Sequence, residues 1–136
     1  MKIEETNDAA RRYAIEPDPA WDWHEERDGV LTVELSWAPD ALAGRLAELV
    51  ASPALAAAFS TEGLTGYRTN AARGYFHEDA FGVKDGETPP PLVRIVVEED
   101  PTADFSYERS QGLTVSARAL AVLRAHCQKL QIEPAN

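Results

Sequence analysis

Pro91-Leu92-Val93-Arg94-Ile95-Val96-Val97 is the stretch that decides the fold of this chain. Its nearly continuous apolar and β-branched character predicts a strand in a central position of a sheet. The prolines at 89–91 favour an extended, stiff backbone directly before this strand. They end a loop that we expect over residues 78–91. The fold is therefore built around a sheet, to which the other segments are added.

The chain before this strand predicts a β-hairpin preceded by an irregular arm. Trp21 and Trp23 alternate with polar residues, as in a strand with one buried face. Asp28-Gly29 is a strong turn signal, and a β-branched strand over residues 30–35 follows it. Residues 1–20 mix charge with prolines and show no period, so we expect an irregular N-terminal arm.

Apolar residues at helical spacing predict three helices. The first begins near Pro39, the second is capped by Ser52 with Pro53 in its first turn, and the third is capped by Ser116. The apolar positions that mark these helices are Leu42, Leu46, Leu49 and Val50, then Leu55 and Phe59, then Leu120, Leu123 and Cys127.

Three short segments predict further strands. They are residues 63–69 and 74–76, whose glycines weaken the strand pattern, and residues 130–133, which alternate before Pro134 and predict a closing strand at a sheet edge. Together these elements predict an α+β fold, in which residues 21–136 form a single domain with a mainly antiparallel sheet packed by two or three helices.

Composition narrows the function classes. The 136 residues carry a net charge of −10, which disfavours direct binding to nucleic acid and to anionic membranes. An acidic surface suits a basic protein partner, although acidity for solubility alone explains the charge about equally well. Cys127 is the single cysteine, so an intrachain disulfide is excluded, and the start of the sequence has no apolar core of a signal peptide. We therefore expect a cytoplasmic protein.

Catalytic and metal-binding patterns are weak. His24, His77 and His126 are scattered and lack the spacing of a helical metal pair, while Asp22-x-His24 is explained equally well by a solvated strand face. Cys127 and the adjacent histidine point about 100° apart on a helix, which favours a buried structural thiol over a nucleophile. The glycines match no nucleotide-binding pattern. We expect no metal, no cofactor and no catalysis.

Acidic residues are the best candidates for a binding surface. The densest carboxylate group follows the central strand and could bind a hard cation, act as an acid/base pair, or form an ordinary solvated turn. We also consider it as a surface that pairs with Arg and Lys of a partner. The candidate contact residues are Glu98, Glu99, Asp100, Asp104, Asp22, Glu25 and Glu26. Trp21, Trp23 and Trp37 are candidate anchors, although core packing is expected for at least two of them.

The order of motifs from about Leu64 to Pro134 resembles the C-terminal half of a group of bacterial polymorphic-toxin immunity proteins. The matching elements are the strand Pro91 to Val97, Asp104-Phe105-Ser106, Leu113-Thr114-Val115-Ser116, Arg118-Ala119-Leu120, and the strand Leu130 to Pro134. Two departures are Glu98-Glu99-Asp100 in place of a glycine, and Arg118 where a helix dipole favours an acid. The resemblance implies a non-catalytic protein that binds a cognate toxin encoded beside it and either plugs its active site or blocks it sterically.

Two other functions remain open. One is a small metabolite-binding protein or enzyme, with a cleft lined by Tyr67, Tyr75, His77 and carboxylates. The other is a regulatory subunit of a different complex. The oligomeric state is not predicted by the sequence.

Overall fold

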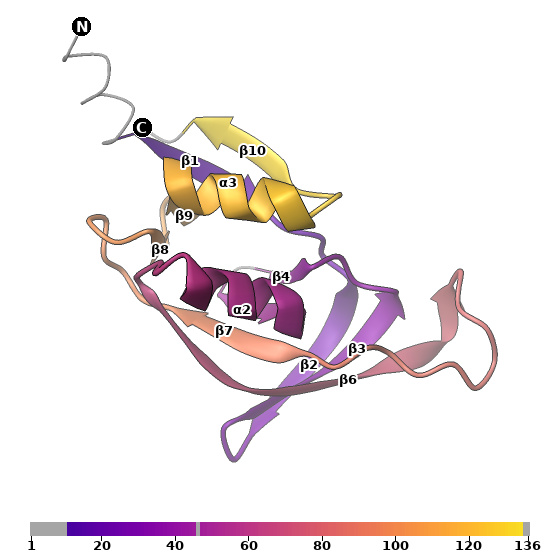
Figure 1. Ribbon diagram of the computed structural model, residues 1–136. Coiled ribbons are helices and arrows are strands. Elements are labelled where there is room, and N and C mark those ends of the chain that lie inside the picture. The colour runs from indigo at the N-terminus through magenta and orange to yellow at the C-terminus, as the bar shows by residue number, and fades with distance from the viewer. Residues whose placement is uncertain (1–10, 46, 135–136) are drawn as a thin grey trace, which may run out of the picture.

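The structure is a computed structural model that describes residues 11–45 and 47–134. It is a single small α+β domain of mostly antiparallel, curled sheets, as the sequence predicts (Figure 1). The elements in chain order are β1 (Arg12–Glu16), β2 (Trp21–Arg27), β3 (Val30–Trp37), β4 (Leu42–Arg45), β5 (Glu48–Ala51), α2 (Pro53–Thr61), β6 (Tyr67–Phe81), β7 (Val93–Val97), β8 (Phe105–Glu108), β9 (Gly112–Ser116), α3 (Ala117–His126) and β10 (Gln131–Pro134).

The strands form two sheets. The larger has the order β2-β3-β6-β7-β5-β4, and the smaller has the order β10-β1-β9-β8. Neighbouring strands are antiparallel except for β3 and β6, which are parallel. Strand β7 lies inside the larger sheet and β10 lies at an edge of the smaller one, so both sequence predictions are confirmed.

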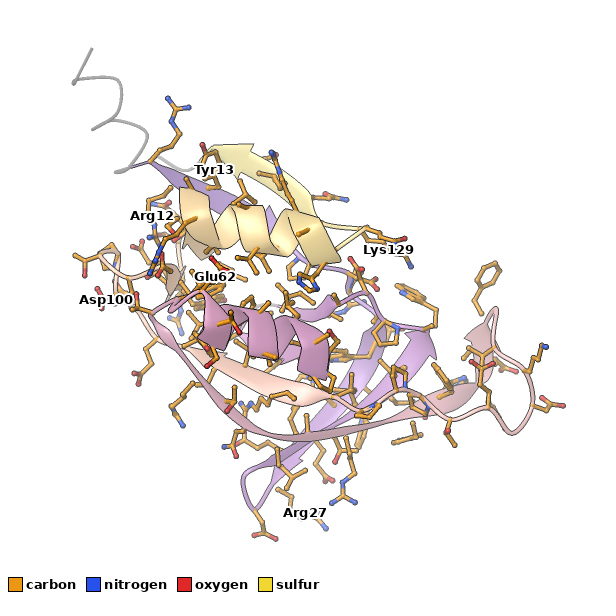
Figure 2. The ribbon with its side chains drawn as sticks, in the orientation of Figure 1. Arg12, Tyr13, Arg27, Glu62, Asp100 and Lys129 are labelled. Carbon is orange, nitrogen blue, oxygen red and sulfur yellow. The ribbon has the colours of Figure 1, made fainter. Side chains whose placement is uncertain are left out.

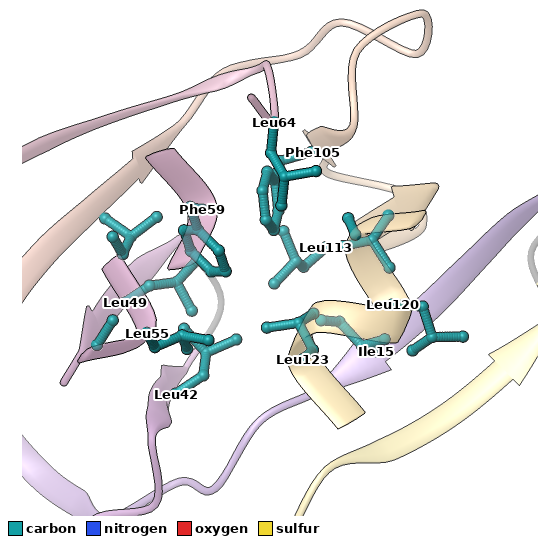
Figure 3. Packing of buried hydrophobic residues seen from close by; sticks show 14 residues of the cluster. Ile15, Leu42, Leu49, Leu55, Phe59, Leu64, Phe105, Leu113, Leu120 and Leu123 are labelled. Atoms are coloured by element: carbon teal, nitrogen blue, oxygen red, sulfur yellow. The ribbon is translucent and has the colours of Figure 1, made fainter. Parts of the chain in front are cut away.

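The main core lies where helices α2 and α3 meet the two sheets. Helix α2 contributes Leu55 and Phe59, which face Leu120 and Leu123 of α3 across the core (Figure 3). Strands of both sheets complete the cluster, which unites the two sheets in one domain. A second cluster, around Trp21, forms where the curl of the larger sheet brings β3 towards β4 and β5.

Local sequence signals place several elements correctly. Asp28 and Gly29 have positive φ angles of 53° and 80°, and they join β2 to β3 in a tight hairpin. The Ser52 hydroxyl accepts a hydrogen bond from the Leu55 amide at 3.1 Å and begins α2. The Ser116 hydroxyl accepts from the Ala119 amide at 3.2 Å and begins α3. Capping therefore fixes both helix starts.

The helix expected after Pro39 is wrong, because the hairpin β4–β5 occupies this segment. Its strands are buried on both faces: Leu42 and Leu49 enter the main core, while Ala43 and Val50 enter the second cluster. A strand that is buried on both faces has a continuous apolar run, which periodicity does not distinguish from a buried helix. Leu46, which we assigned to the same helix, lies outside the described residues.

The irregular arm expected over residues 1–20 is wrong in its second half. Residues 12–16 form β1, which pairs with β10 on one side and β9 on the other. The pairing partners are distant in sequence, so no local pattern indicates them. Residues 1–10 lie outside the described residues.

The two short strands expected at 63–69 and 74–76 belong to one long strand, β6, which begins at Tyr67 and extends to Phe81. Its first part pairs with β7, and its second part pairs with β3. The loop expected from residue 78 therefore begins after Phe81. Gly74 lies where a Cβ atom would meet the side chain of Leu92 at 2.9 Å, so close packing explains the glycine that weakened the strand prediction.

Candidate functional site

The candidate site is the turn after β7, formed by Glu98, Glu99 and Asp100. All three residues are exposed. The backbone of the turn is fixed, because the Tyr107 amide donates to the Glu98 carbonyl at 3.1 Å and the Asp100 amide donates to the Ser106 hydroxyl at 2.9 Å. The turn therefore presents its acidic side chains from an ordered backbone.

The carboxylate of Asp100 takes part in the turn itself. It accepts hydrogen bonds from the Thr102 hydroxyl at 2.6 Å and from the Thr102 amide at 3.0 Å, and these bonds lower the pKa of Asp100. Glu98 and Glu99 form no ion pair with any described residue. Their charge remains available to a partner.

Asp104 differs from the other predicted contact residues because its side chain is buried. Its Oδ1 accepts from the Ser116 hydroxyl at 2.6 Å and from Arg118 Nε at 3.0 Å, and its Oδ2 accepts from the Thr65 amide at 2.8 Å and from Arg118 Nη2 at 2.9 Å. Burial raises the pKa of Asp104, but the donors outweigh burial and hold this pKa well below its ordinary value. Asp104 is therefore a structural carboxylate and does not project towards a partner.

Arg118 occupies a position in the first turn of α3 where the helix dipole favours an acid. Besides the Asp104 carboxylate, its guanidinium donates to the Gly63 carbonyl at 2.9 Å and to the Glu62 carbonyl at 3.4 Å. Glu62 is the C-cap of α2, where backbone carbonyls favour a cation. The arginine thus ties the start of α3 to the end of α2.

Arg12, on β1, contacts the chain that follows the acidic turn and the neighbouring strand β9. Its guanidinium donates to the Ala103 carbonyl and to the carbonyl and hydroxyl of Thr114, the latter two at 3.2 and 3.1 Å. Burial lowers the pKa of Arg12, while Asp104, Asp100 and Glu108 act in the opposite sense. Figure 2 shows Arg12 and Asp100 on the same side of the molecule, at the end of the domain where the acidic turn lies. The sequence does not indicate this residue, because its segment carries no strand pattern.

The predicted acidic residues of β2 lie in a different part of the molecule, and they are already paired. Glu26 contacts Arg94 at 2.9 Å, while Glu25 contacts Arg27 at 3.2 Å and Asp22 contacts Arg45 at 3.0 Å. Arg27 marks the β2–β3 hairpin in Figure 2, far from Asp100. The structure therefore divides the seven predicted contact residues into an exposed turn, a buried carboxylate and three ion-paired side chains.

The tryptophans divide as expected between core and surface. Trp21 is 1% exposed, and the Trp37 indole nitrogen donates to the buried Asp18 carboxylate at 2.9 Å. Trp23 is 44% exposed. Trp23 is therefore the tryptophan that remains available as an anchor.

The cysteine and histidines do not form a reactive group. The Cys127 thiol is partly buried, and burial raises its pKa to about 11, so little thiolate exists near neutral pH. His24 lies edge-on to Trp21, while His77 accepts a hydrogen bond from the Asp79 amide at 3.0 Å. Among residues 11–45 and 47–134, no group of three or more His, Cys, Asp and Glu is placed to hold a metal ion.

The Tyr67, Tyr75 and His77 cleft of the alternative function is not formed. Tyr67 packs between Phe59 and Phe105 in the core, with ring centroids 5.3 and 5.6 Å away. Tyr75 lies eight residues further along β6 and is 44% exposed. A strand separates these two tyrosines by about 25 Å, so they do not share a cleft.

A cavity of about 870 Å³ opens elsewhere, between β1 and β10 on one side and β4 on the other. Its lining combines apolar residues with charges of both signs that are distant in sequence. The charged lining residues are Glu16, Asp18, Arg45, Lys129 and Glu133.

Comparison with protein-family models, curated proteins and solved structures finds no match to this chain. None of the described helices is long and apolar enough to cross a membrane.

Proposed function

We propose that this chain is an immunity-type protein, which binds and neutralises a cognate bacterial toxin without catalysis of its own. The observation that carries the proposal is the acidic turn at residues 98–100, where Glu98 and Glu99 are exposed and form no ion pair with a described residue. An ordered anionic surface attracts a cationic partner and helps to select it. A toxin that acts on nucleic acid is such a partner, because it needs basic residues to bind phosphates.

Two further observations support the proposal. The net charge of −10 gives the whole molecule a field that accelerates encounter with a basic protein. The motif order from about Leu64 to Pro134 resembles that of polymorphic-toxin immunity proteins. The proposal includes a cytoplasmic location, where the toxin would threaten the cell that makes it.

The direct test is a pull-down with the tagged protein as bait and the product of the adjacent upstream gene as prey. The proposal expects a stable complex at low salt, with slower association as ionic strength rises. The matched control is an unrelated acidic protein of similar charge. A neighbour that does not bind, or that binds the control equally well, contradicts the proposal.

A second candidate function is binding of a small metabolite in the cavity between β1, β10 and β4. Its volume of about 870 Å³ lies within the ordinary range for ligand sites, and its lining holds charges of both signs, among them Glu133 and the Arg45 that also contacts Asp22. Native mass spectrometry of the purified protein tests this function. A reproducible bound mass that is lost in a cavity-filling Ala14→Trp variant supports it, and an unliganded protein excludes tight binding from the expression host.

A further inference from the structure

The outer face of the β2–β3–β6 ribbon presents two aromatic side chains that the core does not use. Trp23 and Tyr75 are each 44% exposed. Single exposed aromatics are normal on protein surfaces, but these two are aligned: Trp23 lies opposite Glu34 in the β2–β3 pair, and Tyr75 lies opposite Glu34 in the β3–β6 pair. The three residues form one cross-strand row on one face of the sheet.

Alternation along β3 separates this face from the core. Leu31, Val33 and Leu35 are fully buried on one side, so Glu34 points to the other. In Figure 1, the β2–β3 hairpin extends away from helices α2 and α3. Trp23 and Tyr75, on either side of Glu34, are each 44% exposed. The row is therefore accessible from solvent.

Glu34 is the central group of the row and lacks a cation. It is partly buried on the strand between the two aromatic residues and forms no ion pair with a described residue. Desolvation and the nearby Glu34 charge raise the pKa of Tyr75. The next row carries Glu25, which is paired with Arg27, and Arg73, which lies opposite Thr32. Arg73 does not pair with Glu34, so the Glu34 charge is left without a cation from the described part of the chain.

We propose that Trp23, Glu34 and Tyr75 bind an arginine side chain from a basic partner protein. A guanidinium is planar, stacks on aromatic faces and pairs with a carboxylate through two hydrogen bonds. Trp23 and Tyr75 lie on either side of Glu34, two strand spacings or about 10 Å apart between Cα atoms, so a guanidinium that pairs with Glu34 also lies beside both aromatic side chains. Lysine offers a point charge with no plane to stack, so arginine fits this row better.

This surface is distinct from the acidic turn of the proposed function. Tyr67 lies opposite Val97 beside the turn, and Tyr75 lies eight residues further along the same strand, about 25 Å away. The inference does not require the partner to be a toxin. It names the side chain that this face recognises, whichever basic protein carries it.

The test uses a synthetic peptide of alternating Arg and Gly as the probe, and follows the tryptophan indole N–H signals of the intact protein by NMR. We expect the Trp23 signal to move in a saturable way, while those of the buried Trp21 and of Trp37, bonded to Asp18, stay in place as internal controls. A matched peptide with Glu in place of Arg should leave Trp23 unchanged. An unmoved Trp23 signal, or an equal response to the Glu peptide, overturns the proposal.

Two isosteric variants separate specific binding from general acidity. Glu34→Gln keeps the shape of the row and removes its charge, and we expect affinity for the Arg peptide to fall by at least about fivefold. Glu99→Gln removes one charge at the acidic turn and should leave the Trp23 response unchanged. Equal weakening by both variants overturns the proposal, whatever the result of the toxin pull-down. Unchanged Trp21 and Trp37 signals show that each variant is folded.

Discussion

Asp104 is buried but ionised, because donors from two separate segments, the chain before β6 and the start of α3, surround it. Thr65 lies 39 residues away in sequence, while Ser116 and Arg118 lie 12 and 14 residues away. The sequence shows the acid in a dense carboxylate group but not the donors that the fold brings to it. The sequence therefore predicts Asp104 as a surface acid. In the structure its side chain joins the start of β8 to α3 and to the segment before β6.

Replacing Asp104 with Asn should therefore destabilise the protein. The variant loses an ion pair and leaves buried donors without a charged acceptor, which costs about 2 kcal/mol after allowance for the exposed side of Arg118. Urea unfolding at pH 7 measures this loss. Glu99→Gln, which removes an exposed and unpaired carboxylate, serves as the control and should change stability by less than about 0.5 kcal/mol. Equal stability of Asp104→Asn and the natural protein would refute this role.

The contribution of Asp104 should also depend on pH. Its pKa in the folded protein lies below the value in the unfolded chain, so the unfolded chain takes up a proton first as the pH falls. The stabilisation is fully present above pH about 5 and declines below pH about 4. The difference in unfolding free energy between the natural protein and Asp104→Asn should narrow between pH 6 and pH 3. A constant difference over this range would contradict the assignment.

At the scale of elements, the β4–β5 hairpin depends on the absence of a side chain at Gly44. Its φ angle is 146°, and a Cβ atom at this position would lie 2.0 Å from the Glu48 carbonyl oxygen on the partner strand. Any side chain would force the two strands apart. The glycine thus allows a hairpin in a segment whose leucines also suit a helix.

Gly44→Ala should destabilise the protein by more than about 2 kcal/mol, through both backbone strain and the clash across the hairpin. Gly63→Ala is the matched control, because Gly63 also has a positive φ angle of 65° but no atom within 4 Å of an added Cβ. The control should lose only about 1 kcal/mol. Thermal unfolding of both variants measures the difference, and similar losses would show that the clash is unimportant.

At the element scale, the sequence predicts those segments that carry their own signals. The β2–β3 hairpin has its Asp28-Gly29 turn, α2 and α3 have their serine caps, and β7 has its β-branched run. Strands β1 and β4 lack such signals, because partners distant in sequence or burial on both faces determine them. Strand β6 is not recognised as one strand, because the polar and alanine residues at 70–73 interrupt the β-branched pattern and close packing at Gly74 takes the place of a side chain.

At the scale of the whole molecule, the pairing of charges decides which acids remain available. The predicted contact residues of β2 are neutralised by arginines that lie on other strands or further along β2 itself. Two of these pairs, Glu26–Arg94 and Asp22–Arg45, join segments that are distant in sequence, so composition alone does not indicate them. The sequence indicates the exposed turn directly. The row of Trp23, Glu34 and Tyr75 is formed only by the pairing of three strands, so the sequence does not indicate it.

Charge reversal tests which acidic surface meets the partner. The double variant Glu98→Lys, Glu99→Lys should slow association with the toxin by about tenfold at low salt, because the local field changes sign. Glu16→Lys, Glu133→Lys is the matched control, since it makes the same change in net charge at the β1–β10 edge. Surface plasmon resonance at several ionic strengths measures both. Equal slowing by the two variants would assign the effect to net charge and exclude the turn as the contact.

The most direct measurement of the central claim is growth of a bacterial host that expresses the product of the adjacent upstream gene, with and without this protein. The immunity proposal predicts that the neighbour arrests growth when expressed alone and that co-expression of this chain restores growth. Failure of the folded, co-expressed protein to rescue growth, or a neighbour that is harmless on its own, would contradict the proposal.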